Sequence, residues 1–142
     1  MQKYIYISIG GAVGASLRLA IDNIHIWNFH ENIPLNTFII NIAGSFILAL
    51  FLTVAYEVLA VDADIRLGVA TGLLGSFTTF STLCKETFEL MARGEYFLAI
   101  AYMAISTIVG LAAAYFGIVL AREAILKVVR PTLENVVDEG EV

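Results

Sequence analysis

The segment from Gly72 to Glu86 gathers the side chains of this chain that are best suited to handling an ion. It mixes glycines and phenylalanines with hydroxyl groups at Ser76, Thr78, Thr79, Ser81 and Thr82. The segment lies inside an apolar stretch long enough to cross a bilayer, where lipid cannot satisfy a hydroxyl or an exposed peptide group. Membrane proteins place ion sites where a helix is interrupted in this way. The pattern therefore predicts an interrupted helix whose polar groups face protein, water or an ion.

Two further apolar stretches carry polar side chains at helical spacing. Thr37, Asn41 and Ser45 are four residues apart and lie on one face of a helix, as do Tyr102 and Ser106. Together with the hydroxyls and aromatic rings of the first segment, they would form a polar but uncharged lining. Helix packing in lipid also uses small and hydroxyl-bearing residues, and Asn41 could simply bond a neighbouring helix. The spacing therefore fits either an ion pathway or a surface for helix packing.

Glycines four residues apart favour close helix packing in lipid. Gly10 and Gly14 form one such pair, and Gly68 and Gly72 form another. Arg18 continues the first stripe, about one turn from the end of its apolar stretch. Its side chain either snorkels to the membrane interface or supplies a positive charge that concentrates anions at the mouth of a pore.

Two charges, Lys85 and Glu86, follow the hydroxyl cluster directly. Neighbours in sequence point away from each other on a helix, so we expect Glu86 to face protein and Lys85 to reach the membrane interface. No apolar stretch carries a carboxylate at its centre. This argues against a carrier of cations or protons, which normally needs one.

The composition places the chain among membrane proteins. Of its 142 residues, 59% are hydrophobic and only 15% are charged, whereas about a quarter of the residues in a soluble domain are charged. The formal charge of −5 comes largely from an acidic C-terminal end, so no nucleic acid partner is indicated. Cys84 is the only cysteine, which excludes an intrachain disulfide. His25 and His30 share one loop, and we expect no enzymatic chemistry from them.

Four stretches are long enough to cross a bilayer as helices, which takes about 20 apolar residues each. The predicted spans cover residues 4–21, 33–56, 67–92 and 96–121, so residues 1–121 form one all-α integral membrane domain with four transmembrane helices. The tail 122–142 is expected to continue the last helix until Pro131 ends it. Residues from Asp138 onward are expected to be disordered.

The connections between the spans are short and polar. Trp27 in the first connection suits a membrane interface, Pro34 can begin the second span, and Gly94 centres a tight turn before the fourth. The side that holds both termini carries five basic residues, namely Lys3, Arg66, Arg122, Lys127 and Arg130. The other side carries Arg93 and at most Arg18. The positive-inside rule then favours both termini in the cytoplasm, and we expect the chain to lie in the inner membrane.

The order of these motifs resembles the Fluc (CrcB) family of fluoride channels. The resemblance covers residues 4 to about 121 and rests on three patterns: Gly10-Gly11-x-x-Gly14-Ala15-x-x-Arg18, then Pro34-x-x-Thr37-x-x-x-Asn41-x-x-Gly44-Ser45-Phe46, then Gly72-x-x-Gly75-x-x-Thr78-Thr79-Phe80-Ser81-Thr82 with Glu86. The Thr-Thr-Phe-Ser-Thr run is the most specific of them. The tail after Arg122 lies outside the match.

The resemblance implies a passive, fluoride-specific channel that lowers intracellular fluoride toxicity. It implies an antiparallel, dual-topology dimer with two fluoride pathways and a third helix broken at its centre. One structural Na⁺, which is not transported, would lie on the dimer axis, held by the backbone carbonyls of Gly75 and Thr78. The implied fluoride pathway runs along Asn41, Phe80, Ser81, Thr82, Tyr102 and Ser106, with Arg18 as the charge at its mouth.

The sequence departs from the family pattern at two positions. Leu83 stands where a second pathway phenylalanine is expected, and Gly110 stands where the polar track often has a serine. Phe77 cannot replace the missing ring on helical spacing. Leu83 therefore leaves the channel interpretation in place but makes the pair of pathway phenylalanines incomplete.

Two other functions and two kinds of partner stay open. A small four-helix multidrug or cation exporter would need a carboxylate in its first helix, which has none before Asp22. A non-transporting assembly subunit would explain the glycine stripes but not the hydroxyl cluster. The partner is either a second copy of this chain or a related chain of opposite orientation. The bias of basic residues fits poorly with a homodimer, whose copies must insert both ways.

Overall fold

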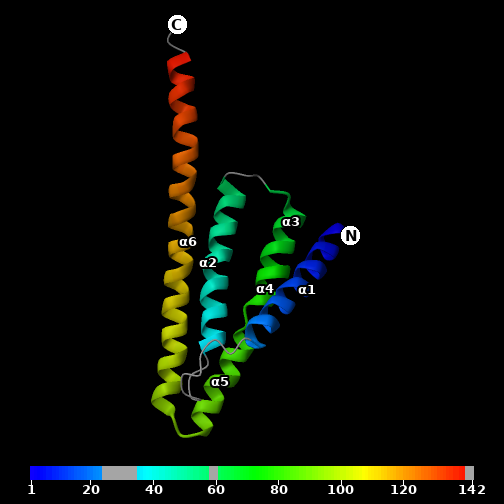
Figure 1. The fold of residues 1–142 in the computed structure, drawn as a ribbon, viewed down its shortest axis with the longest axis vertical. Helices are drawn as coiled ribbons and strands as arrows, with labels where there is room; N and C mark the ends of the chain where they lie inside the picture. Colours follow the sequence, from blue (N-terminus) through cyan, green and yellow to red (C-terminus); the bar gives the residue numbers. More distant parts are fainter. Residues whose placement is uncertain (24–34, 58–60, 140–142) are drawn as a thin grey trace.

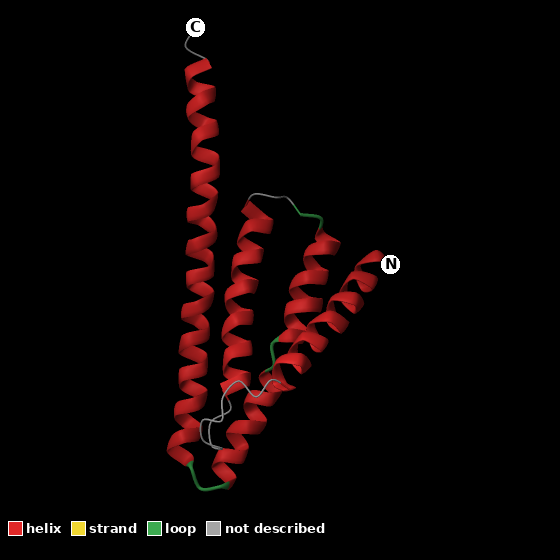
Figure 2. Ribbon diagram, in the orientation of Figure 1, coloured by secondary structure: helices red, strands yellow, loops and turns green. Residues whose placement is uncertain are grey.

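The computed structural model describes residues 1–23, 35–57 and 61–139, and this part of the chain contains helices and no strand (Figure 1). The elements are α1 (Gln2–Asn23), α2 (Leu35–Glu57), α3 (Ala63–Leu67), the π-helix η1 (Gly68–Leu74), α4 (Gly75–Phe77), α5 (Phe80–Ala92) and α6 (Tyr96–Glu139). Helices α3, η1 and α4 follow one another without a gap, and a short non-helical segment separates them from α5 (Figure 2).

Four helical stretches are long and apolar enough to cross a membrane: Gln2–Asn23, Leu35–Glu57, Ala63–Ala92 and Tyr96–Ile125. They coincide with the four predicted spans. Large apolar side chains stay exposed on them, including Phe97 at 86% and Leu111 at 68%, as expected of helices that lie in lipid. The prediction of an all-α, multi-pass membrane protein is confirmed.

Helix α6 packs along α2 (Figure 1). Gly117 permits the close approach, because a Cβ at this position would lie 2.6 Å from the carbonyl oxygen of Phe46. The rings of Phe46 and Phe116 stack with their centroids 6.0 Å apart. Arg122 and Glu57 form an ion pair of 2.9 Å between the same two helices. These contacts fix how the polar residues of α2 and α6 lie relative to one another.

Helix α1 packs against η1 and α4 through its glycines. A Cβ on Gly10 would lie 2.9 Å from the backbone nitrogen of Leu73, and a Cβ on Gly72 would lie 2.6 Å from the carbonyl oxygen of Ile7. A larger residue at either position would force the two backbones apart. The predicted packing role of the glycine stripes is therefore confirmed. It ties α1 to the part of the third span that precedes the break.

The turn between α5 and α6 is built on Gly94, as predicted. Gly94 has a φ of 81°, a left-handed conformation that glycine adopts at no steric cost. Its N–H donates to the Met91 carbonyl, and the Glu95 N–H donates to the Leu90 carbonyl, both at 3.0 Å. These bonds close α5 and reverse the chain, so that α6 returns beside α5 and α2.

The prediction that Pro131 ends the last helix is wrong, because α6 continues to Glu139 and projects well beyond the other helices (Figure 1). A proline removes one backbone donor and crowds one carbonyl, a local cost that a helix with intact turns on both sides can absorb. Asp138 is therefore helical and not disordered, while residues 140–142 lie outside the described residues. The predictions for His25, Trp27, His30 and Pro34 also fall outside them.

Candidate functional site

The third span is broken at Thr78 and Thr79, as predicted. Thr78 has φ −74° and ψ 153°, and Thr79 has φ −145° and ψ 110°, so both are extended between α4 and α5. Gly44 of α2 lies against this point, since a Cβ there would collide with the Thr78 methyl group and lie 3.4 Å from the Phe77 ring. A glycine in α2 thus allows the broken segment to approach that helix.

Asn41 of α2 bonds the backbone of the broken segment twice. Its Nδ2 donates to the Thr79 carbonyl at 3.0 Å, and its Oδ1 accepts from the Thr79 N–H at 2.8 Å. The side-chain amide therefore pairs with both polar groups of one residue, as a neighbouring strand would. Sequence spacing placed Asn41 on a polar face but gave no indication of this partner.

Thr79 also caps α5. Its Oγ1 accepts from the Thr82 N–H at 3.2 Å and lies 2.8 Å from the Thr82 hydroxyl and 3.3 Å from the Ser81 hydroxyl. An N-cap threonine satisfies one of the unpaired N–H groups at a helix start. The predicted pathway residues Ser81 and Thr82 are thus brought together with Asn41 around a single residue, Thr79.

The break redirects the donors that would otherwise bond the carbonyls of Gly75 and Thr78. In an unbroken helix these carbonyls would accept from the N–H groups four residues on, those of Thr79 and Thr82. Here the Thr79 N–H donates to Asn41, and the Thr82 N–H donates to the Thr79 hydroxyl. Carbonyl oxygens released in this way suit a hard cation. The residues present therefore fit the sodium site that the resemblance implies.

Ser76 links the segment before the break to α1. Its Oγ lies 2.9 Å from the Gly11 carbonyl oxygen of α1, 2.7 Å from that of Gly72 and 3.2 Å from that of Leu73. A Cβ on Gly14 would collide with this hydroxyl. The hydroxyl cluster therefore divides into Ser76, which serves helix packing, and the residues at and after the break.

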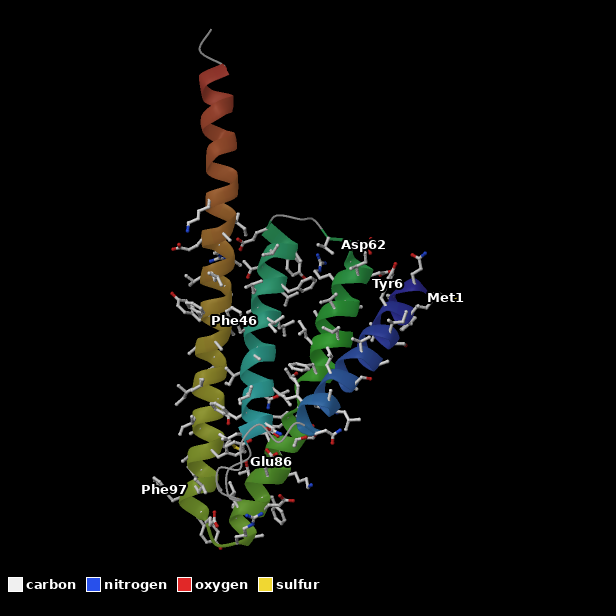
Figure 3. The ribbon with its side chains drawn as sticks, in the orientation of Figure 1. Met1, Tyr6, Phe46, Asp62, Glu86 and Phe97 are labelled. Atoms are coloured by element: carbon white, nitrogen blue, oxygen red, sulfur yellow. The ribbon has the colours of Figure 1, made fainter. Side chains whose placement is uncertain are left out.

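Glu86 joins three helices. Thr37 Oγ1 of α2 donates to Glu86 Oε1 at 2.7 Å, and the Tyr102 hydroxyl of α6 donates to Glu86 Oε2 at 2.8 Å (Figure 3 labels Glu86). Lys85 is 74% exposed and pairs with Glu89 at 3.6 Å. The predicted division, with Glu86 facing protein and Lys85 facing outward, is confirmed. The carboxylate itself was not predicted as part of the site, although Thr37 on the stripe of Asn41 was an available signal.

The remaining predicted site residues are less closely grouped. Leu83 and Tyr102 are buried in one apolar cluster. Ser106 is buried, and its hydroxyl has no hydrogen-bond partner within the described part of the chain. Phe80, in contrast, is 73% exposed. Arg18 is partly exposed on α1 and forms no hydrogen bond or ion pair with the described residues.

No cluster of metal-ligating side chains is present in residues 1–23, 35–57 and 61–139. The groups around the break that could bind an anion are hydroxyl, amide and aromatic side chains. This arrangement can replace the water of a small ion without supplying a full opposite charge.

Comparisons with known proteins agree with this arrangement. The profile of the family described as "CrcB-like protein, Camphor Resistance (CrcB)" matches residues 5–118. A protein of Sulfurihydrogenibium sp. (strain YO3AOP1) named "Fluoride-specific ion channel FluC" is 38% identical over 122 residues, covering 86% of this chain and 98% of its own.

A protein with the same name from Chloroflexus aurantiacus (strain ATCC 29366 / DSM 635 / J-10-fl) is 40% identical, covering 86% of this chain and 97% of its own. These relatives are named as channels, which agrees with the expectation that this chain is not an enzyme. The matched region spans all four membrane helices and stops before the projecting end of α6. The chain belongs to the CrcB family of membrane proteins.

Proposed function

We propose that this chain forms a fluoride-specific channel that lets fluoride leave the cytoplasm passively and so limits its toxicity. The observation that carries the proposal is the gathering of uncharged amide and hydroxyl groups at the helix break. Asn41, Ser81 and Thr82 meet there around Thr79. Relatives that match the same region are named fluoride-specific ion channels.

Fluoride is small and strongly hydrated, so a pore must replace its water with other donors. Asn41, Ser81, Thr82 and Ser106 supply such donors, and the buried Ser106 hydroxyl supports this role because no described residue accepts from it. Phe80 adds the positive edge of its ring. Weak donors in series let an anion enter and leave, whereas a full positive charge within the pore would hold it. Arg18, at the end of its span, raises the local anion concentration.

Tyr102 and Leu83 complete the proposed pathway on the side of α6. The Tyr102 hydroxyl donates to Glu86, and Leu83 packs against the same tyrosine. Leu83 stands where a second pathway phenylalanine is expected and offers only an apolar wall. The pathway therefore relies on Phe80 for its aromatic edge.

A partner chain would complete the site. Phe80 is 73% exposed and Ser81 is exposed beside it, although a hydroxyl is costly to leave in lipid. We propose that a second, antiparallel chain covers them, either a copy of this one or a related chain of opposite orientation. A Na⁺ held by the Gly75 and Thr78 carbonyls of both chains would join the two breaks, as structure and not as cargo. Both termini would then lie on the cytoplasmic side of the inner membrane in the copy that follows the positive-inside rule.

The test is growth of bacterial cells that lack their own fluoride export. Cells that produce this chain should grow at fluoride concentrations that stop the parent cells, and cells that produce a Phe80→Ile variant at equal membrane level should not. Growth that is no better than that of the parent cells would reject the proposed function. Protection against cationic drugs instead would favour a multidrug exporter, which α1 disfavours because it has no carboxylate before Asp22.

A further inference from the structure

The side chain of Asn41 binds the protein backbone in addition to offering a donor to an anion. An amide carries one carbonyl and two N–H groups. The carbonyl and one N–H are already taken by the backbone of Thr79, at 2.8 Å and 3.0 Å. An unpaired peptide group is costly in a membrane. These two bonds provide hydrogen-bond partners for the N–H and the carbonyl of the extended Thr79. They also occupy most of the hydrogen-bonding capacity of Asn41.

We propose that Asn41 is a two-point clamp on the helix break, and that the same two bonds fix its remaining N–H as a directed donor. The acceptor half of the clamp draws the Thr79 N–H away from the carbonyl of Gly75, which that N–H would bond in a continuous helix. Asn41 thereby keeps α4 and α5 apart and leaves the Gly75 carbonyl for a cation. The donor and cation roles rest on the proposed function, whereas the clamp itself does not.

The surroundings of Asn41 support a fixed orientation for its amide. One turn before it, Thr37 is buried and bonded to Glu86, and three residues after it, Gly44 lies against Thr78. The helix face that carries Asn41 is therefore held against α5 on one side and the broken segment on the other. A rigid donor costs little reorganisation when an anion arrives, which is how preorganised sites gain strength.

Amide hydrogen exchange at Thr79, measured by NMR on the purified protein in detergent, tests the clamp. Asn41→Ala removes both bonds, so protection of the Thr79 N–H should fall at least about tenfold, while amides in the middle of α5 keep theirs. Asn41→Asp retains an acceptor for that N–H, so protection there should stay within about threefold of wild type. The control Ser45→Ala, one turn further along the same face, should leave Thr79 unchanged. Unchanged protection in Asn41→Ala, or lost protection in Asn41→Asp, would overturn the clamp.

Fluoride efflux at neutral pH from vesicles that contain the same variants tests the directed donor. Asn41→Asp keeps the bond that accepts from the Thr79 N–H but has no N–H of its own, so its efflux should fall at least about tenfold, as should that of Asn41→Ala. Efflux of Asn41→Asp at the wild-type rate would overturn the donor role. If wild type itself releases no fluoride, the proposed function fails, and the exchange result still decides the clamp.

The release of the Gly75 carbonyl has its own readout. Added Na⁺ should raise the melting temperature of wild type and of Asn41→Asp, but not that of Asn41→Ala, in which Thr79 is free to rejoin the helix. An equal rise in Asn41→Ala would overturn the link between the clamp and the cation.

Discussion

Thr37 and Glu86, which lie on different membrane-spanning helices, are joined by a hydrogen bond of 2.7 Å in which the hydroxyl donates to Oε1. The second oxygen of the same carboxylate accepts from Tyr102 at 2.8 Å. Glu86 therefore holds α2, α5 and α6 together just beyond the helix break. A partly buried carboxylate needs such donors, because its desolvation is otherwise uncompensated.

Replacing Thr37 by valine keeps the shape of the side chain and removes the donor. We expect Thr37→Val to lower the free energy of unfolding by about 1 kcal/mol, since one oxygen of Glu86 is left unbonded. The control is Thr53→Val, because among the described residues the Thr53 hydroxyl bonds only the Ala49 carbonyl of its own helix. Unfolding of both variants in detergent would be compared, and an equal loss in the two would contradict the role given to Glu86.

The glycines of α1 offer a matched pair for testing helix packing. A Cβ on Gly14 would collide with Leu73 and Ser76, whereas a Cβ on Gly11 would meet nothing within 4 Å. Gly14→Ala should therefore destabilise the fold by about 1–3 kcal/mol, and Gly11→Ala should be neutral or slightly stabilising. Thermal unfolding in detergent measures both. Similar melting temperatures for the two variants would show that α1 does not pack on η1 in this way.

The N-cap of α5 makes a separate prediction about Thr79. Thr79→Ala removes the oxygen that accepts from the Thr82 N–H and should cost about 1 kcal/mol of stability. Thr79→Ser keeps that oxygen and should retain most of the stability. Chemical unfolding distinguishes them, and a serine variant as unstable as the alanine variant would assign the loss to the methyl group instead.

Two exposed phenylalanines on α5 allow the proposed pathway and the lipid-facing surface to be tested separately. Phe80 is 73% exposed and Phe88 is 69% exposed, but only Phe80 adjoins the break. Phe80→Ile should lower fluoride flux at least about tenfold, through loss of the ring edge, with the protein still folded and assembled. Phe88→Ile should conduct as wild type. Flux from vesicles decides the matter, and wild-type flux in Phe80→Ile would remove this ring from the pathway.

The four spans and the break were predictable because their signals are local. Apolar runs set the spans, and the hydroxyl cluster at Thr78 and Thr79 marked the interruption. The partners of Asn41 and Glu86 were not predictable in the same way, since periodicity gives the face of a helix and not the residue that it meets. The π-helical form of η1 also has no local signal, because its packing against α1 depends on contacts distant in sequence.

The incorrect prediction at Pro131 has a related cause. The sequence rule treats a proline as a helix end because it removes a backbone donor. Helix α6 nevertheless continues to Glu139. A local penalty can be outweighed by the turns on either side of it, and a rule that considers one residue at a time does not include them.

Flux of fluoride and of chloride from liposomes that contain the purified protein tests the central claim most directly. Vesicles loaded with either anion are diluted into anion-free buffer, and release is followed with ion-selective electrodes, with protein-free vesicles as the baseline. The account predicts release of fluoride well above the baseline and release of chloride at the baseline. Equal release of the two anions, or no release of fluoride, would contradict it.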